Sequence, residues 1–501
     1  MTDPEAPLCP EPAPTPANHL VPAAGRVPAA GRALEPAKQR TVLLVVVVAE
    51  FLTMFMVSAV NIALPAIAKE WHVSTVTLSW ITLAYILTIA AVLMPAGKLA
   101  DLTGRKRFYI AGLVVFTIIA FAGAFAPSAP VLIALRLLNG VGAAMLYACT
   151  TAIITLAFPP RARGRAMGIQ VASVYLGLAF GPLLGGIIID NLGWRYVFVI
   201  GGALGAVDVV LSWWGMRGVE WREPKRAPFD IVGSLTWAVA LTLFLLGLSL
   251  LPEAAGWVLL AAGAAGTAGF VWREARAPDP ILDLDLFRKN RVFACSNAAT
   301  FACYAATYAM TFLMSLYLQY NKGLVAQTAG LILVSGTVVQ TLFSPVAGRL
   351  ADRVQARLVA AAGMAVCVLG LGGLAFLGSG TSYWYIIASL CVLGLGFAFF
   401  SSPIMHTIMG SVEQRYTGVA SATIATMRTT GQNVSMGLAT LLLSVFVGRH
   451  SIGTADYPDL LTSIRVTFAI LAVLCLFGVG AALVGPRRSE APGGSAAENP
   501  E

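Results

Sequence analysis

Fourteen apolar runs, each roughly as long as a membrane is thick, constrain this chain more than any other feature. A helix that crosses a bilayer needs about 20 mostly apolar residues. The runs are separated by short polar segments and lie at 41–65, 76–96, 107–125, 131–156, 165–189, 196–216, 230–250, 256–272, 292–318, 327–347, 357–377, 383–405, 418–447 and 464–485. The weakest are the short run at 256–272 and the run at 418–447, which begins with polar residues. The pattern predicts an all-α integral membrane protein with fourteen transmembrane helices and both termini on one side.

The composition supports this prediction. Hydrophobic residues make up 58% of the chain and charged residues 11%, whereas soluble domains carry about 25% charged residues. The net charge of +9 comes from basic residues scattered through short loops. With the N-terminus inside the cell, successive loops alternate between rich and poor in Lys and Arg, as the positive-inside rule requires. We therefore expect a multi-pass plasma membrane protein with cytoplasmic termini, surrounded by lipid, and no nucleic-acid binding.

The two ends of the chain differ from its apolar middle. Residues 1–40 are rich in Pro and Ala and lack aromatic residues, so we expect a disordered cytoplasmic tail rather than a secretory signal. A second such tail is predicted at 486–501. The seven cysteines form no CxxC pair and fall mostly in apolar runs, which is typical of small core residues. We expect no cofactor and no metal.

One loop sequence occurs twice. GKLADLTGRKR begins at Gly97, and a weaker copy, GRLADRVQAR, begins at Gly348, so that Asp101 aligns with Asp352 at an offset of 251 residues. Gly97 would let two helices approach closely, and Asp101 could cap a helix end or pair with a nearby arginine. The copy departs from the pattern, because Gln355 and Ala356 replace Gly104 and Arg105. A membrane protein whose second half repeats its first is typical of transporters.

A third sequence signal is GLAFGPLLGG at 177–186. Gly177, Gly181 and Gly185 recur every four residues and share one helix face, which predicts close helix packing. Pro182 removes a backbone hydrogen bond and allows a bend.

Together these motifs resemble those of the major facilitator superfamily, whose loop between helices 2 and 3 has the first pattern. GxxxGPxxGG in helix 5 is similar to the motif of the superfamily's antiporters. Three further segments resemble the fourteen-helix drug:proton antiporter branch: FLTMFMVSAVNIALP at 51–65, FDIVGSL at 229–235 and MRTTGQNVSMG at 427–437. The resemblance covers essentially the whole membrane portion.

The resemblance implies two pseudo-symmetric six-helix halves, at 41–216 and 292–485, and a linker at 217–291 that holds two extra transmembrane helices. It also implies that the repeated loop is a latch between the halves. Conformational gating is therefore predicted for Gly97, Asp101, Arg105, Gly177, Gly181, Pro182, Gly185, Gly348 and Asp352.

Ionisable residues inside the spans are the candidates for proton coupling. Arg136 shares a helix face with Asn139, at a position where the antiporters usually have Gln, and the resemblance links Arg136 to proton coupling. The alternative is that Arg136 extends to the outer interface. Asp208 is a second buried acid, in a usually peripheral helix. It could instead hydrogen-bond to the third helix or contact lipid headgroups. His406, near the inner end of its span, is more often structural.

Glu50 is the main proton-coupling candidate. Many members of the branch have an aspartate where this chain has Met56, but Glu50 lies eleven residues before Asn61 and shares its helix face. A lone ionised carboxylate near the bilayer midplane costs several kcal/mol, so Glu50 should be able to bind a proton. The alternative is a structural acid paired with Arg136 or Arg428.

A substrate cavity is predicted from polar and aromatic residues on cavity-lining helices. The candidates are Asn61, Trp80, Tyr85, Asn139, Tyr304, Tyr308, Thr311, Gln340 and Arg428. Aromatic residues with polar tips suit bulky, partly apolar molecules, and Glu50 would favour cations. Aromatic stripes are also common in helix packing and at membrane interfaces.

The sequence therefore predicts a secondary active exporter of small organic molecules, amphipathic or cationic and drug-like, that works by proton antiport and alternating access as a monomer. An uptake symporter for an organic solute and a flippase for a lipid-like substrate are the alternatives. No GxxxxGK[ST] loop is present, so ATP-driven transport is disfavoured, and no enzyme activity is expected. The substrate, the stoichiometry and the choice of proton or sodium stay open.

Overall fold

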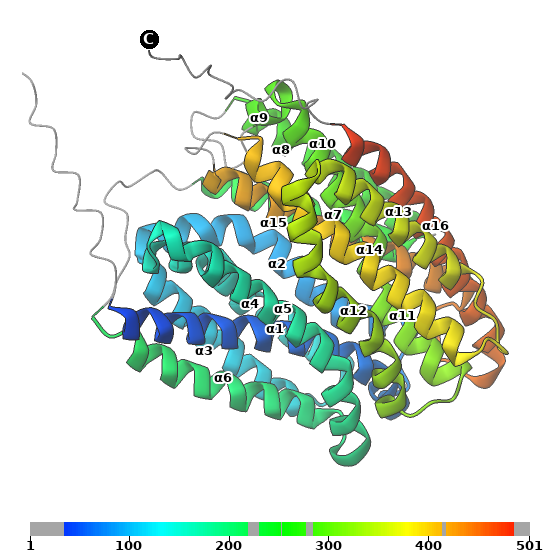
Figure 1. Cartoon of the computed structure of the whole chain (residues 1–501). Coiled ribbons are helices and arrows are strands. Elements are labelled where there is room, and N and C mark those ends of the chain that lie inside the picture. The colour runs from blue at the N-terminus through cyan, green and yellow to red at the C-terminus, as the bar shows by residue number, and fades with distance from the viewer. Residues whose placement is uncertain (1–34, 219–229, 252, 277–283, 413–416, 485–501) are drawn as a thin grey trace, which may run out of the picture.

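The chain folds into a bundle of long helices, described here from a computed structural model (Figure 1). The structure describes residues 35–218, 230–251, 253–276, 284–412 and 417–484. The tails predicted at the two ends of the chain lie almost wholly outside these residues. Helix α1 begins at Pro36, within the stretch predicted as a tail, because proline suits the first turn of a helix.

Six helices form the first half and two more follow it. They are α1 (Pro36–Trp71), α2 (Thr75–Thr103), α3 (Arg105–Ala124), α4 (Ala129–Ala157), α5 (Pro160–Leu192), α6 (Arg195–Gly215), α7 (Ile231–Leu250) and α8 (Ala254–Glu274). After the short α9 (Leu284–Lys289), the second half contains α10 (Arg291–Thr307), α11 (Met310–Leu316), η1 (Tyr317–Asn321), α12 (Ala326–Arg353), α13 (Ala356–Ala375), α14 (Tyr383–Gly410), α15 (Thr417–Phe446), η3 (Thr454–Asp456) and α16 (Tyr457–Leu483).

The number of spans agrees with the prediction once α15 is included. Within the described residues, thirteen helical segments are long and apolar enough to cross a membrane, and α10, α11 and η1 form one of them. Helix α15 has 30 residues but falls outside that set. It corresponds to the run with the polar beginning, and it packs inside the bundle against α2 and α10, where polar side chains find protein partners.

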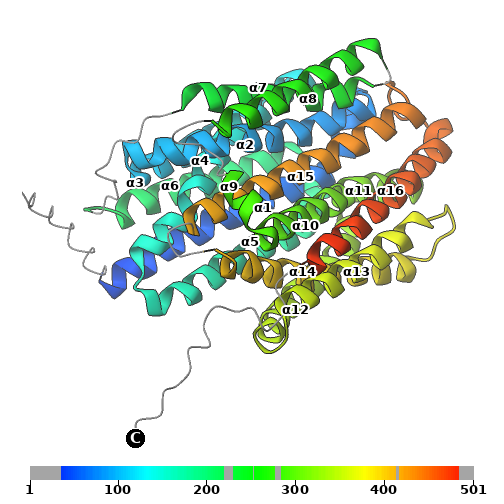
Figure 2. The same ribbon diagram turned by 90° about the horizontal axis from the view of Figure 1, so that it is seen from above.

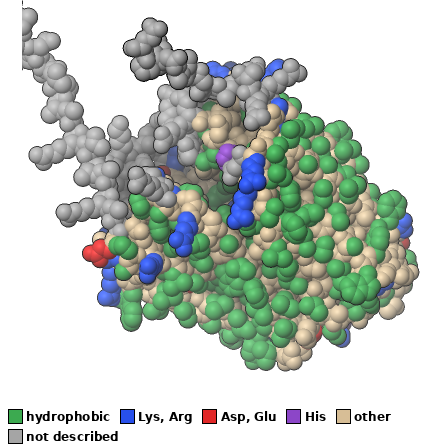
Figure 3. Space-filling view, viewed as in Figure 1, with side chains coloured by type: hydrophobic (Ala, Val, Ile, Leu, Met, Phe, Trp, Pro, Cys, Tyr) green, Lys and Arg blue, Asp and Glu red, His purple; other side chains and the backbone are tan. Residues whose placement is uncertain are grey.

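The two halves lie side by side, with colours from blue to green in the first and from green to red in the second (Figure 1). We call the end of the bundle where α1 begins and α16 ends the terminal end, and the opposite end the distal end. Lys and Arg side chains gather toward the grey terminal segments, and the rest of the visible surface is largely hydrophobic (Figure 3). That division is what a membrane-embedded body with one basic face requires.

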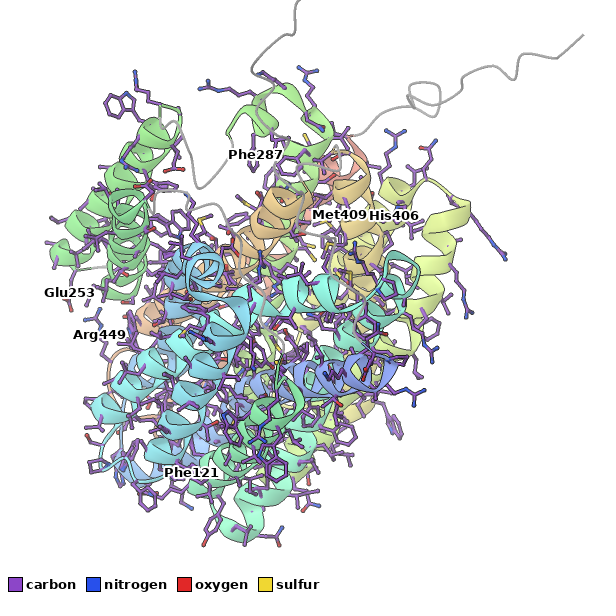
Figure 4. All side chains as sticks on the ribbon, turned by 90° about the vertical axis from the view of Figure 1, so that its left-hand side faces the viewer. Phe121, Glu253, Phe287, His406, Met409 and Arg449 are labelled. Atoms are coloured by element: carbon purple, nitrogen blue, oxygen red, sulfur yellow. The ribbon has the colours of Figure 1, made fainter. Side chains whose placement is uncertain are left out.

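Helices α7 and α8 form a hairpin at one edge of the bundle, while α12 and α13 lie at the opposite edge (Figure 2). Helix α7 packs on α2 of the first half and on α15 of the second. The indole of Trp237 donates a hydrogen bond to the carbonyl of Ala90 at 3.1 Å. At the distal end, Glu253 forms an ion pair with Arg449 (Figure 4). The hairpin therefore contacts both halves.

Glycines bring α5 against α1 in the first half. A Cβ atom at Gly177 would lie 2.5 Å from the carbonyl oxygen of Phe51, and Gly181 and Gly185 pack against Ser58 and Ala59 in the same way. These three residues make the close contacts that their spacing predicts. Their role in gating stays a prediction.

The repeated loop is less tightly packed than predicted. Asp101 pairs with Arg105 at 2.6 Å, as expected for a nearby arginine. A Cβ atom at Gly97, however, would meet nothing within 4 Å, and one at Gly348 would meet only the Ser402 hydroxyl, at 3.4 Å. The prediction of close helix approach at Gly97 is therefore wrong for this conformation, because its face of α2 is open here. Asp352 lies in α12, but its side chain is outside the described residues.

Candidate functional site

A cavity of about 160 Å³ lies between the two halves, at the middle of the bundle. Its walls come from α1, α2, α4 and α5 of the first half, and from α10, α11, α12, α14 and α15 of the second. Tyr308 lies in the break between α10 and α11, Met310 begins α11, and both line the cavity. Ser435 stabilises this break by accepting a hydrogen bond from the Ala309 backbone at 3.0 Å. Interrupted helices of this kind often mark functional sites.

Most of the predicted cavity residues line this space. They are Asn61, Tyr85, Tyr304, Tyr308, Thr311, Gln340 and Arg428, and the predicted gating residue Pro182 joins them. Sequence reasoning missed Tyr147, Phe397 and Gln432. Helical spacing could have found two of these, because Gln432 lies four residues after Arg428 and Tyr147 lies eleven residues after Arg136.

Two predicted cavity residues lie elsewhere. Trp80 packs against the cluster formed by Leu241 and Leu245 of α7 with α2, because the hairpin covers that face of α2. Asn139 accepts a hydrogen bond from Arg136 at 3.2 Å and donates one to the Phe116 carbonyl at 3.0 Å. The prediction that these two side chains line the cavity is wrong.

Arg136 is buried behind the cavity, with 2% of its surface exposed. Besides its bond to Asn139, its Nε donates to the carbonyl oxygen of Ile81 at 3.2 Å. Its guanidinium carbon lies 4.1 Å from the centre of the Tyr85 ring, and that ring lines the cavity. The alternative of an arginine extended to the outer interface is therefore excluded.

Glu50 is buried as well, at 5% exposure, but it is not among the residues that line the cavity. The amide of Gln170 lies 3.5 Å from its Oε1. Its charge interacts with that of Arg428, although the described residues contain no ion pair within 4.0 Å between Glu50 and either Arg136 or Arg428. Glu50 is therefore not paired directly with either arginine in this conformation, as the alternative of a structural acid had required. A cation in the cavity would not touch Glu50, so the expected cation preference loses its basis.

Asp208 and His406 lie away from the cavity. Asp208 is fully buried in α6, and neither of its oxygens has a hydrogen-bond partner among the described residues. The expected alternatives, a bond to the third helix and contact with lipid headgroups, are therefore wrong. His406 is exposed near the end of α14 (Figure 4). Within the described residues, no group of three or more His, Cys, Asp or Glu side chains is placed to hold a metal.

Hydrogen bonds join the two halves at the distal side of the cavity. The Asp190 carboxylate at the end of α5 accepts the backbone N–H of Gln327, at the start of α12, at 2.7 Å. The amide of Gln319 donates to the Ile62 carbonyl at 3.1 Å. Further bonds of this kind join Ser315 to Asn61, Asn433 to Ile86, Thr440 to Ser79 and Thr75 to Gly448. Tight glycine contacts support them, because Gly186 packs on Ala326.

The structure has two halves around a central cavity, a repeated loop and an extra hairpin. A comparison of the sequence with models of known protein families agrees with this architecture. A sequence model of the Major Facilitator Superfamily matches residues 46–436 and 298–500. The chain belongs to this superfamily. The predicted family and fold are thereby confirmed, and the protein is a multi-pass membrane transporter.

Relatives within the superfamily have several described roles. The chain is 32% identical to the riboflavin transporter RibZ of Clostridioides difficile (strain 630) over 413 residues, covering 82% of this chain and 88% of that protein. It is 32% identical to the multidrug resistance protein Stp of Mycobacterium tuberculosis (strain ATCC 25618 / H37Rv), covering 77% and 73%. It is 31% identical to the cephamycin export protein CmcT of Amycolatopsis lactamdurans, covering 88% and 93%.

A solved structure has the same fold. The crystal structure of a bacterial homolog of the human lysosomal transporter Spinster, in an inward-facing and unoccupied conformation, has a TM-score of 0.67 to this chain. The alignment covers 90% of this chain and 97% of that one, at 16% sequence identity. At that identity the likeness concerns the fold alone.

Proposed function

We propose that this protein exports small organic molecules across the plasma membrane in exchange for protons. The observation that carries the proposal is a central cavity, held shut on its distal side by bonds between the halves, with a buried carboxylate just outside its wall. The names of Stp and CmcT, a resistance protein and an export protein, favour export. The basic terminal end would face the cytoplasm, and the cavity would fill from that side.

Glu50 is the proton carrier in this proposal. An ionised carboxylate at membrane depth is costly unless donors or cations compensate it. Gln170 from α5 and the field of Arg428 from α15 supply partial compensation in this conformation. Because Gln170 and Arg428 belong to different halves, a change in the position of the halves would change how well ionised Glu50 is compensated. Gain or loss of the proton would then be tied to the conformation.

Alternating access would proceed by breaking the distal contacts and closing the terminal end. Asp190 would release the start of α12, and the distal bonds from α11 and α15 to α1 and α2 would open. The six-helix halves would move as units, because glycine contacts such as that between Gly177 and Phe51 hold helices together within a half. Protons, the organic substrate and lipid are the only partners proposed, and the working unit would be a monomer.

The proposal is tested in liposomes that contain the purified protein and carry an imposed proton gradient. The probes are riboflavin and a cephamycin, the compounds named for two relatives. We expect at least one probe to accumulate on the acidic side, and Glu50→Gln to reduce that accumulation at least about tenfold, since a glutamine cannot exchange a proton. Asp208→Asn is the matched control, and it should leave accumulation within about twofold because Asp208 lies away from the cavity.

The direction of movement decides between the functions considered. Accumulation on the alkaline side would indicate proton symport and overturn the proposal. Equal accumulation by wild type and Glu50→Gln would remove Glu50 from the mechanism. Loss of accumulation in Asp208→Asn, but not in Glu50→Gln, would indicate that Asp208 of α6 carries the proton instead of Glu50. Movement of a labelled phospholipid, and of neither organic probe, would indicate a flippase.

A further inference from the structure

The lining of the cavity carries one sign of charge. Among the described residues that line it, Arg428 is the only one with a charged side chain, and no Asp or Glu is present. The other polar groups of the wall are neutral and include the amides of Gln340 and Gln432 and the hydroxyl of Thr311. A guanidinium offers up to five N–H donors and accepts no hydrogen bond, so it selects ligands with acceptor atoms.

A second cation lies immediately behind this wall. Arg136 stacks on the Tyr85 ring at 4.1 Å, so one face of that ring already holds a positive charge. Tyrosine rings attract cations through their faces, but here an entering cation would contact one guanidinium group and lie in the field of a second, with no Asp or Glu among the described residues of the lining. Glu50, the carboxylate that interacts with Arg428 among the described residues, lies outside the lining. The cavity should therefore repel cations despite its tyrosines.

Unused polar groups in the wall point to a polar ligand. Tyr85, Tyr147 and Tyr308 all line the cavity, and their buried hydroxyls have no hydrogen-bond partner within 3.5 Å among the described residues. Buried hydroxyls are normally paired. Widening of the cavity around a bound molecule would let these hydroxyls reach its polar atoms, while the tyrosine rings and Phe397 contact its flat surface.

We propose that the substrate is an uncharged aromatic molecule with carbonyl or similar acceptor groups. Arg428 donates hydrogen bonds to one of these groups, and its positive charge excludes cations. This inference rests on the proposed antiport in one respect, because Glu50 is ionised in the loaded carrier. A substrate anion at Arg428 would then lie within the field of a second negative charge and would compete with Glu50 for the same guanidinium. An uncharged acceptor avoids that competition.

The inference is tested by equilibrium binding to the full chain in detergent, which needs no proton gradient. Three probes share one ring system: 9-anthracenecarboxamide, 9-anthracenecarboxylate and (9-anthracenylmethyl)trimethylammonium. At a pH where Glu50 is ionised, wild type should bind the carboxamide roughly tenfold more tightly than either charged probe. Arg428→Gln should weaken carboxamide binding and remove the discrimination against the ammonium probe. Glu50→Gln should strengthen binding of the carboxylate probe alone.

Two further variants keep the result interpretable. Arg428→Lys retains the charge and should retain the exclusion of the ammonium probe, even if its carboxamide binding is weaker. Arg465→Gln removes an exposed arginine from α16, far from the cavity, and should leave all three affinities unchanged.

Three results would overturn the inference. They are equal or tighter binding of the ammonium probe by wild type, tighter binding of the carboxylate than of the carboxamide by wild type, and no measurable binding of the carboxamide. The proposed antiport fails separately, in the liposome assay. Selective binding of the carboxamide without proton-driven transport would support the inference that Arg428 selects uncharged substrates, and it would refute the proposed proton antiport.

Discussion

The two halves of this transporter share a fold but bury charge very differently. In the described residues, the first half buries Glu50, Arg136 and Asp208 at 5% exposure or less. The second half buries no Asp, Glu, Lys or Arg to that extent, and Arg428, which is half-buried, faces the cavity. Its interior instead contains thiols such as those of Cys303, Cys367 and Cys475. A repeated architecture therefore does not impose repeated chemistry.

This difference suggests a division of work between the halves. Buried charge is expensive in a membrane and often marks a functional site. In our proposal the first half carries the proton on Glu50. The second half supplies Tyr304, Gln340 and Arg428 to the cavity and selects the substrate. Both functions meet at the boundary between the halves, where Arg428 interacts with Glu50.

Arg136, which is buried, and Arg428, which faces the cavity, offer the largest test of this division. Arg136→Gln should abolish transport and lower stability, because the Asn139 Oδ1 loses its donor and Tyr85 loses the group stacked on it. An unsatisfied buried polar group costs about 1–3 kcal/mol. Arg428→Gln should leave stability nearly unchanged, since its side chain faces a cavity. Thermal unfolding in detergent and the liposome assay measure both effects. Equal destabilisation by the two variants would contradict the comparison.

The two halves should resemble each other in helix packing, although they differ in buried charge. A Cβ atom at Gly177 would lie 2.5 Å from the Phe51 carbonyl oxygen, and one at Gly431 would lie 2.6 Å from that of Phe301. Both Gly177→Ala and Gly431→Ala should therefore destabilise the protein, by about 1–3 kcal/mol, because helix backbones must move apart. Gly97→Ala is the control. It meets nothing within 4 Å and should be neutral or stabilising by up to about 1 kcal/mol.

Thermal unfolding of these three variants separates rigid from open surfaces. A loss of stability in Gly97→Ala as large as in Gly177→Ala would show that the open face of α2 is closed in the prevailing conformation. A loss confined to Gly177→Ala would show that only the first half is rigid.

The fold could be predicted from the sequence almost completely, because lipid permits few solutions. Backbone groups inside a bilayer must be satisfied within helices, so apolar run length gives the number of spans directly. Even α15, which begins with polar residues, was predicted as a span from the apolar run at 418–447. The halves and the extra hairpin followed from the repeated loop and the family resemblance.

The site was only partly predictable. Residues on helix faces near known candidates, such as Tyr304 and Tyr308, were found by periodicity. Trp80 was misplaced because the sequence does not say which face of α2 the hairpin covers. The packing at Gly97 was wrongly predicted because, in the proposed alternating access, its neighbours would depend on which end of the carrier is open. Glu50 was expected to favour cations in the cavity because depth along a helix does not reveal whether a side chain reaches the cavity.

The smallest expected effect concerns the hairpin, which belongs to neither half. Asp230 caps the start of α7, outside the membrane span, and accepts two hydrogen bonds from Arg273 of α8, at 2.6 and 2.7 Å. These bonds, with a smaller contribution from the Gly233 N–H, hold the pKa of Asp230 below its usual value. A carboxyl with a lowered folded-state pKa stabilises the protein fully above its unfolded pKa of about 3.9, and that contribution is lost as the pH falls through the folded-state value.

Asp230→Asn should therefore lower the melting temperature slightly near neutral pH, and the difference from wild type should shrink steadily below about pH 4. The effect is small because Arg273 is 34% exposed and the pair is screened by solvent and salt. Melting curves at several pH values, at low and high salt, measure it, and a difference that grows on acidification would contradict the assignment. If Asp230→Asn leaves transport unchanged, the contact between Asp230 and Arg273 has only a structural role. If transport falls while stability holds, the hairpin would have to take part in the movement of the halves, to which it is joined at Ala90 and Arg449.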